Sequence, residues 1–276
     1  MNKTATVHKR SSQDDCVSLM GVRFDALDEG QVIQRVIDGL ALGQGGWVIT
    51  SNLDHLRRSR IDTDFHSMLS EANLVVADGM PLLWAARIQG TPLPDRVTGS
   101  SLVSTLARAA SKAGRSLYLF GGDPGAAEGA ARQLRSRWPE LRIAGCCCPP
   151  VGFEHDLEQA GRITDALVTA RPDIVYVALG SPKQERLIRK LRHRLPRAWW
   201  IGVGISLGFL SGQVHRAPRW MQRAGLEWAH RLVQEPPRLA GRYLVYGLPF
   251  AGRLLASALA GRLRKRSGSK APANLP

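Results

Sequence analysis

The chain has 276 residues, 44% of them hydrophobic, with 38 lysines and arginines against 23 aspartates and glutamates. A chain of this length and hydrophobicity can bury a substantial core, in one large domain or in one domain with an appendage. The formal net charge of +15 restricts the expected partners to anions, namely nucleic acid, phosphorylated substrates or an anionic membrane surface.

The four cysteines, Cys16 and the run at 146–148, predict reduced thiols in a cytoplasmic protein. No CxxC pair and no Cys/His ligand spacing occurs in the sequence, so neither a structural zinc site nor a disulfide framework is indicated. Residues 1–16 are polar and lack the apolar segment of a signal peptide. We expect residues 1–16 and residues 267–276 to form disordered tails.

Residues 17–212 predict an α/β catalytic domain. An extended pair (residues 17–25) is followed by an amphipathic helix that begins at Asp28. Short runs that are apolar on both faces then alternate with loops and helical segments; the runs are residues 47–50, 74–77, 117–120, 141–144, 174–179 and 199–203. Parallel strands covered by helices have this character. The pattern predicts a Rossmann-like, mostly parallel sheet with helices on both faces.

The second of these runs, residues 74–77, is followed directly by Asp78 and Gly79, and a helical segment begins immediately after them. An acid at the end of a buried strand is where open α/β sheets usually hold a ligand. Aspartate is also a favoured N-cap residue. Spacing alone leaves both interpretations of Asp78 open, as a catalytic acid or as a helix cap.

Glycine-rich turns follow three of the expected strands, at residues 121–125, 180–182 and 202–204. Such turns expose backbone N–H groups to a phosphate. None matches G-x-G-x-x-G or the P-loop, so a dinucleotide oxidoreductase is not supported. Each turn alone is typical of ordinary strand-to-helix geometry, but three at one edge of a sheet favour nucleotide binding.

Residues 213–266 form a basic appendage in which arginines alternate with Trp, Leu, Tyr and Phe. This mixture predicts amphipathic helices at a membrane surface, with arginines at the level of the headgroups. The alternative is an ordinary helical cap with a solvated basic face. The most apolar stretch, residues 244–261, is interrupted by Pro249 and Arg253, so no membrane-spanning helix is predicted.

Other catalytic motifs are weak or missing in the sequence. Residues 62–64 read D-x-D, but they lie between two helical segments and predict a helix-capping turn. The seven histidines have no metal-ligand spacing, and no G-x-S-x-G elbow of a serine hydrolase occurs.

Five segments carry a resemblance to a known family, and the ADG element, the PKQE element and the basic aromatic block among them are specific in combination. The five are TSNLDHL (50–56), the ADG-containing stretch 73–102, LYLFGGDPG (117–125), ALGSPKQE (178–185) and the basic aromatic block 215–244. Together they resemble the bacterial WecG/TagA/CpsF glycosyltransferases (glycosyltransferase family 26). The resemblance covers about residues 17–250, most of the chain.

The resemblance implies an inverting, metal-independent transfer of a hexose-type sugar (glucose, N-acetylmannosamine or its uronic acid). The implied donor is a UDP-sugar, the acceptor is a polyprenyl-diphosphate-linked saccharide, and the products are cell-surface or exopolysaccharide intermediates. No cofactor is implied. Family members work at the cytoplasmic membrane face, so we expect a peripheral protein docked through residues 213–266. The oligomeric state stays open, a homo-oligomer included.

By position, the resemblance also implies roles for individual residues. Asp78 is the general base that accepts the proton of the acceptor hydroxyl. Thr50 and Asn52 line the same pocket, where Arg96 and Gln184 contact the donor or its phosphates. Arginines of the appendage close over the active site and bind diphosphate; they are Arg231, Arg238 and Arg242. Such an assignment suits an inverting transfer, which needs one base and cations beside the departing diphosphate.

The chain departs from the commoner family pattern at two positions. Ser101 and Gly208 stand where many members carry an acid, which leaves the donor sugar open. The motif ADGMPLLWA and the GVGIS turn favour the exopolysaccharide glucosyltransferase branch of the family. A basic nucleic-acid-binding protein is the competing hypothesis, but the arginines form no clean stripe and no reading motif occurs. We therefore expect no nucleic acid partner.

Overall fold

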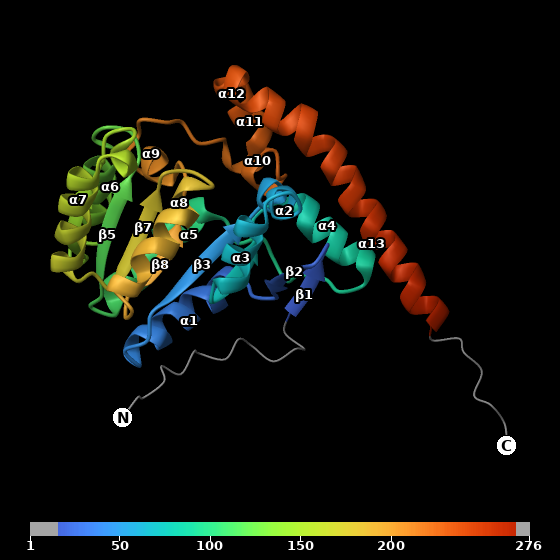
Figure 1. The fold of residues 1–276 in the computed structure, drawn as a ribbon, viewed down its shortest axis with the longest axis horizontal. Coiled ribbons are helices and arrows are strands. Elements are labelled where there is room, and N and C mark those ends of the chain that lie inside the picture. Colours follow the sequence, from blue (N-terminus) through green and yellow to red (C-terminus); the bar gives the residue numbers. More distant parts are fainter. Residues whose placement is uncertain (1–15, 269–276) are drawn as a thin grey trace.

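A six-stranded parallel sheet forms the centre of the structure, a computed structural model that describes residues 16–268 (Figure 1). Its strand order is β4-β3-β8-β7-β5-β6, and every neighbouring pair is parallel. The strands are β3 (Gly46–Ser51), β4 (Leu74–Ala77), β5 (Ser116–Gly121), β6 (Arg142–Cys147), β7 (Ile174–Ala178) and β8 (Trp199–Gly202). The predicted Rossmann-like α/β fold is confirmed.

Helices cover both faces of the sheet, because successive side chains of a strand enter different apolar clusters. In β3, Trp47 and Ile49 join one cluster and Val48 joins the other. The Val48 cluster contains residues of α1 (Glu29–Ala41), α5 (Gly99–Lys112), α6 (Ala126–Arg137) and α9 (Ser206–Ser211). The Trp47 cluster contains residues of α2 (Leu53–Ser59), α3 (Thr63–Glu71), α4 (Met80–Gln89), α7 (Leu157–Ala170) and α8 (Lys183–Leu191).

The predicted beginning of the domain is confirmed. β1 (Cys16–Leu19) and β2 (Val22–Asp25) form a separate antiparallel hairpin, and Asp28 caps α1 in a capping box with Gln31. The expected tails fall largely outside the described residues. Of their residues, Cys16 begins β1 and residues 267 and 268 end the last helix, so the boundaries at these two places differ from the prediction.

The predicted strand at 141–144 lies three residues too early at its end. β6 runs to Cys147 and forms the edge of the sheet, paired only with β5. Its side chains are half-buried rather than buried. An edge strand lacks the two covered faces that make a central strand apolar throughout, so its end carries no clear signal in the sequence.

The appendage consists of short helices followed by one long helix. They are α10 (Arg219–Arg223), α11 (Glu227–Gln234), α12 (Pro236–Ala240), the π-helical segment η4 (Gly241–Gly247) and α13 (Leu248–Gly268). The prediction that Pro249 interrupts this stretch is wrong, because α12, η4 and α13 form one continuous helix from Pro236 to Arg264. By length and composition alone, the helix from Pro236 to Arg264 could cross a membrane.

One face of α13 is part of the core. Phe250, Leu254 and Ala258 are buried in the same cluster as Leu82 and Ala85 of α4, and Figure 1 shows α13 running beside α4 along the side of the domain. The spacing of four residues puts the three buried side chains on one stripe of the helix. The appendage is therefore packed onto the sheet domain rather than separate from it.

Leu254→Ala should destabilise the protein by about 2–4 kcal/mol, because the side chain is only 1% exposed and its removal leaves a cavity against α4. Urea unfolding monitored by tryptophan fluorescence measures the change. Leu259→Ala is the matched control, since Leu259 is 51% exposed on the same helix and should change stability by less than about 0.5 kcal/mol. Equal effects of the two substitutions would contradict the packing of α13 on α4.

Candidate active site

Asp78 and Thr50 lie at the carboxyl edge of the sheet, on neighbouring strands. Thr50 pairs with Val76, and the N–H of Asp78 donates to the carbonyl of Ser51 at 2.8 Å. β8 lies on the other side of β3 and ends at Gly202. The strand ends that sequence reasoning singled out therefore meet at one edge, where a parallel sheet offers its ligand crevice.

Asp78 is not the cap of the helix that follows it, so that interpretation of the sequence is wrong. The N-cap of α4 is Gly79, without a side-chain hydrogen bond, and its φ of 146° is a conformation that favours glycine. The Asp78 carboxylate instead accepts a hydrogen bond from the backbone N–H of Gly99, the first residue of α5. Asp78 thus faces across the strand ends, toward the beginning of a different helix.

The surroundings of Asp78 raise its pKa to about 7. Removal of the carboxylate from water is the largest cause, and the negative charge of Glu227 adds to it. Arg96, Arg216 and the Gly99 N–H act in the opposite direction but do not outweigh burial. A carboxylate with a pKa close to neutral can take up a proton under cellular conditions, which is the property of a general base.

The other predicted pocket residues of the sheet domain are engaged in building this edge. Thr50 is 7% exposed, and a Cβ at Gly99 would lie 3.3 Å from its Oγ1. The Asn52 side chain caps α2 by accepting from Asp54 N at 3.0 Å and His55 N at 3.1 Å. These contacts hold α2 and α5 against the end of β3.

Gln184 stabilises the turn that follows β8. Its Oε1 accepts from the N–H of Gly204 at 3.1 Å, and its Nε2 donates to Glu185 at 2.8 Å. A side chain on Gly202 would come within 2.6 Å of the Gln184 amide, so the close approach requires glycine there. Gln184 is 5% exposed, and its side-chain hydrogen bonds are to this turn and to Glu185.

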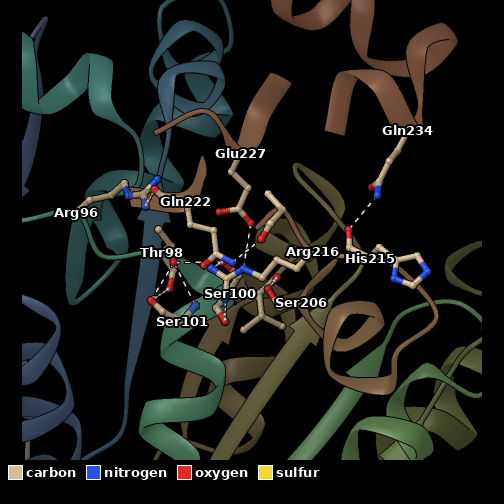
Figure 2. Close-up of polar contacts among 12 residues, drawn as sticks. Arg96, Thr98, Ser100, Ser101, Ser206, His215, Arg216, Gln222, Glu227 and Gln234 are labelled. Carbon is tan, nitrogen blue, oxygen red and sulfur yellow. Dashed lines mark hydrogen bonds and ion pairs between the residues drawn. The ribbon is translucent and has the colours of Figure 1, made fainter. Parts of the chain in front are cut away.

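Arg96 connects the sheet domain to the appendage. Its guanidinium influences Asp78 and donates to the carbonyl of Gln222 at 2.8 Å (Figure 2). Arg216 also lies near Asp78 and bonds both Ser100 of α5 and Glu227 of α11. Sequence reasoning missed Arg216 and Glu227, since nothing in their local pattern shows which part of the sheet domain they face.

A second site, the arginine pocket, lies between α2 and the appendage. Its volume is about 370 Å³, and it is lined by Asp54, Arg57, Arg58, Pro237, Arg238, Gly241, Arg242 and Tyr246. Four of these residues are arginines and only one is acidic. Arg238 and Arg242 were predicted to bind diphosphate, whereas Arg57 and Arg58 were missed, although the arginine pair directly follows the strand-end motif and could have drawn attention.

The arginine pocket holds more positive charge than its own partners neutralise. Arg242 forms an ion pair with Asp54 at 3.0 Å, and Arg57 lies 5.1 Å from the centre of the Tyr246 ring. Among the described residues, the Nε atoms of Arg58 and Arg242 are buried without a hydrogen-bond partner. Buried cationic donors of this kind favour a multiply charged oxyanion such as a diphosphate.

The third predicted diphosphate residue, Arg231, lies elsewhere. It is on α11 and is not among the residues that line the arginine pocket. Its Nε is likewise buried without a partner in the described part of the chain. The structure thus groups Arg238 with Arg242 and leaves Arg231 apart.

The two departures from the family pattern have structural explanations. Ser101 Oγ donates to Glu29 of α1 and bonds Thr98, the N-cap of α5. Gly208 is buried in α9, where a Cβ would lie 3.1 Å from Val214, so an acidic side chain would require Val214 to move. Asp62 of the D-x-D motif caps α3, as predicted. Across residues 16–268, no group of three or more His, Cys, Asp or Glu could hold a metal ion.

Comparison with known proteins places these features in context. Two relatives carry the name N-acetylglucosaminyldiphosphoundecaprenol N-acetyl-beta-D-mannosaminyltransferase. The protein of Bacillus subtilis (strain 168) is 34% identical over 177 residues, which are 64% of this chain and 67% of that protein. The protein of Bacillus spizizenii (strain ATCC 23059 / NRRL B-14472 / W23) is 29% identical over 195 residues, 71% of this chain and 74% of that protein.

Neither relative supports the predicted exopolysaccharide glucosyltransferase branch, because both are named for the transfer of N-acetylmannosamine. The family itself matches along nearly all of the described chain. A model described as "Glycosyl transferase WecG/TagA/CpsF family" covers residues 17–264, from β1 to α13. This chain belongs to the WecG/TagA/CpsF family of glycosyltransferases.

Proposed function

We propose that this glycosyltransferase moves a hexose-type sugar from a UDP-sugar to a polyprenyl-diphosphate-linked saccharide, with inversion and without a required metal. The observation that carries the proposal is the position of Asp78. Its carboxylate, with a pKa of about 7, lies at the strand ends beside Arg96, in a domain whose appendage adds an arginine pocket. A base and a set of cations are the two requirements of this reaction.

N-acetylmannosamine is the sugar that the relatives favour, and N-acetylglucosaminyl-diphospho-undecaprenol is the corresponding acceptor. We extend both to this chain as the first donor and acceptor to test. The identities of 34% and 29% support this choice over glucose. Synthesis of a cell-envelope polymer is the process in which such a transfer would serve.

The proposed chemistry is a single displacement. Asp78 accepts the proton of the acceptor hydroxyl as its oxygen forms a bond to the anomeric carbon of the donor. The bond between that carbon and the diphosphate oxygen breaks, and its electron pair leaves with UDP. Arg96 stabilises the negative charge that develops on the donor diphosphate, because hydrogen bonds between guanidinium and phosphate are charge-assisted.

The remaining predicted residues have supporting or binding roles in this proposal. Thr50, Asn52 and Gln184 keep the strand ends and the turn after β8 in place around the donor. Arg238 and Arg242 bind the diphosphate of the lipid-linked acceptor in the arginine pocket. Arg231 of α11 lies outside that pocket, with its Nε buried and without a partner among the described residues.

We further propose that the appendage docks on the inner face of the cell membrane as a peripheral element. Exposed apolar side chains follow the appendage at Trp220, Val233, Val245, Leu248 and Leu259. Arg253 and Arg262 are exposed on α13, and each basic residue near an anionic leaflet contributes about 1 kcal/mol. Because α13 packs on α4, it lies along the domain, which favours docking over spanning.

The rate of transfer should depend on pH through Asp78. A general base works only when deprotonated, so kcat/KM should be constant above pH 8 and fall about tenfold per unit below the Asp78 pKa of about 7. Initial rates between pH 5 and pH 9 measure this acidic limb, the fall of kcat/KM toward low pH. A rate that stays constant down to pH 5 would contradict the assignment of Asp78 as the base.

A donor panel tests the proposed function. The full-length protein is incubated with a short polyprenyl-diphosphate-linked N-acetylglucosamine and, separately, with UDP-N-acetylmannosamine, its uronic acid or UDP-glucose, with EDTA present. Mass spectrometry should detect one added N-acetylhexosamine with the first donor. Transfer from UDP-glucose alone would replace the proposed sugar, and a lack of transfer from all donors, combined with salt-sensitive DNA binding, would favour the nucleic-acid hypothesis.

A further inference from the structure

Two arginines, Arg96 and Arg216, bridge the sheet domain and the appendage (Figure 2), and the charges of both influence Asp78. Arg96 reaches from the loop before α5 to the Gln222 carbonyl, at the end of α10. Arg216, in the segment between α9 and α10, reaches back to α5 and onward to α11. The environment of the base is thus assembled from both parts of the protein.

Arg216 is the more extensively bonded of the two. Its Nη2 donates to Ser100 Oγ at 2.7 Å, its Nη1 to the Ser100 carbonyl at 3.4 Å, and its Nε to Glu227 Oε1 at 3.1 Å. The side chains of Arg216 and Glu227 are only 26% and 15% exposed. Because the pair is partly withdrawn from water, it should contribute more than a surface ion pair, which adds little.

The Arg216 bonds end close to the base. Ser100 is the second residue of α5, and the first residue, Gly99, donates its N–H to the Asp78 carboxylate. Ser100 Oγ also lies 3.2 Å from the hydroxyl of Thr98, the N-cap of the same helix. A shift of Ser100 would therefore shift the hydrogen-bond donor of Asp78.

A further contact joins the same part of the appendage to the turn that carries Asp78. Gly225, between α10 and α11, has a φ of +73°, and a Cβ at this position would clash with the side chain of Met80. Met80 begins α4, two residues after Asp78. The loop between α10 and α11, which contains Gly225, therefore lies directly against the turn that carries Asp78.

We propose that Arg216 and Glu227 are positioning residues, a latch that ties α11 to the first turn of α5 and makes Asp78 competent only while the appendage is closed. The effect of the latch on catalysis rests on the proposed function. Its effect on the packing of the appendage against the sheet domain does not. Neither residue touches the reacting atoms in this account. Their role is to hold in place the Gly99 N–H, which donates to Asp78, and the charged groups around Asp78.

The two residues act on Asp78 with opposite sign. The charged groups that influence it are Arg96 from the loop before α5, Arg216 from the segment before α10, and Glu227 from α11. Glu227 raises the pKa of Asp78, and Arg216 lowers it. Removing one charge should therefore move the pH dependence in the direction opposite to removing the other.

Kinetic measurements of Arg216→Gln and Glu227→Gln test the proposal. Both variants should lower kcat by roughly tenfold to a hundredfold, since small misplacements of catalytic groups have effects of this size, with little change in the KM for the UDP-sugar. The acidic limb of kcat/KM should move to higher pH in Arg216→Gln and to lower pH in Glu227→Gln. Arg219→Gln, which removes an exposed arginine of α10, is the matched control and should change neither quantity.

Hydrogen exchange provides a readout that does not depend on activity. Backbone amides of residues 219–234 should exchange faster in both latch variants than in wild type or Arg219→Gln, because α10 and α11 lose their tie to α5. If the wild type transfers no sugar, the proposed function fails and exchange alone decides about the latch. Two results would overturn the proposal. One is unchanged hydrogen exchange in both variants. The other is an acidic limb of the kcat/KM profile that shifts in the same direction in both variants or does not shift in either.

Discussion

Asp78→Asn should lower kcat by about 10²- to 10⁴-fold, which is the usual contribution of a general base, while the protein stays folded. Asparagine keeps the size of the side chain and an oxygen that can accept from the Gly99 N–H. It cannot take the proton of the acceptor hydroxyl. Steady-state rates at pH 8, with circular dichroism as a check on folding, measure the effect.

The same substitution should leave stability unchanged or increase it at pH 8. The folded-state pKa of Asp78, about 7, is above the ordinary aspartate value of 3.8, so the folded protein favours the protonated form. The corresponding stabilisation is present below pH 3.8 and is lost as pH rises through 7. Asp165→Asn, on the exposed side of α7, is a matched control for activity. A folded Asp78→Asn protein with more than a tenth of wild-type activity would remove Asp78 as the base.

Arg242→Gln should raise the KM for the lipid-linked acceptor roughly 10- to 100-fold. A hydrogen bond to a charged group contributes about 1.5–3 kcal/mol, and Arg242 lines the arginine pocket with its Nε buried and unbonded in the described structure. Substitution also leaves Asp54 without its closest ion pair, at 3.0 Å. Initial rates with a short-chain acceptor, at saturating UDP-sugar, measure this KM.

Arg57→Gln should raise the same KM, because Arg57 lies on the opposite wall of the arginine pocket. The control is Arg60→Gln, which removes an equal charge from the end of the same helix, where Arg60 is exposed and bonds the Met20 carbonyl. If Arg57→Gln and Arg242→Gln raised the KM for the UDP-sugar and left that for the acceptor unchanged, the arginine pocket would belong to the donor instead.

The sheet could be predicted from the sequence because its central strands are buried on both faces. Residues 74–77 and 174–178 are apolar throughout, and the structure buries every one of them. Apolar runs bounded by polar loops leave little choice besides covered parallel strands. The edge strand β6 was misplaced because its half-buried side chains do not repeat that signal.

The continuity of the last helix could not be predicted from residue preferences. Proline lacks the N–H of a regular helical bond and usually breaks a helix. Here Pro249 comes two residues after the π-helical segment η4, and the N–H of Leu248 between them donates to the Tyr243 carbonyl, five residues back. The altered bonding before Pro249 accommodates its missing N–H, and such an irregular segment has no recognisable sequence pattern.

The candidate site could be predicted only in part. Asp78 stands out because it comes directly after an apolar strand and directly before a glycine, a local pattern visible in the sequence. The partners of Arg216 and Arg96 are 116 and 126 residues away along the chain, at Ser100 and Gln222. Contacts of this range depend on how the appendage packs on the sheet domain, which the local sequence of neither segment specifies.

The configuration of the new glycosidic bond tests the proposed mechanism most directly. UDP-N-acetylmannosamine carries its sugar in the α configuration, and one displacement assisted by a single base, Asp78, inverts it. Nuclear magnetic resonance of the purified lipid-linked product should therefore show only the β anomer. An α-linked product would mean retention, which requires a second step or an enzyme nucleophile, and would contradict the role assigned to Asp78.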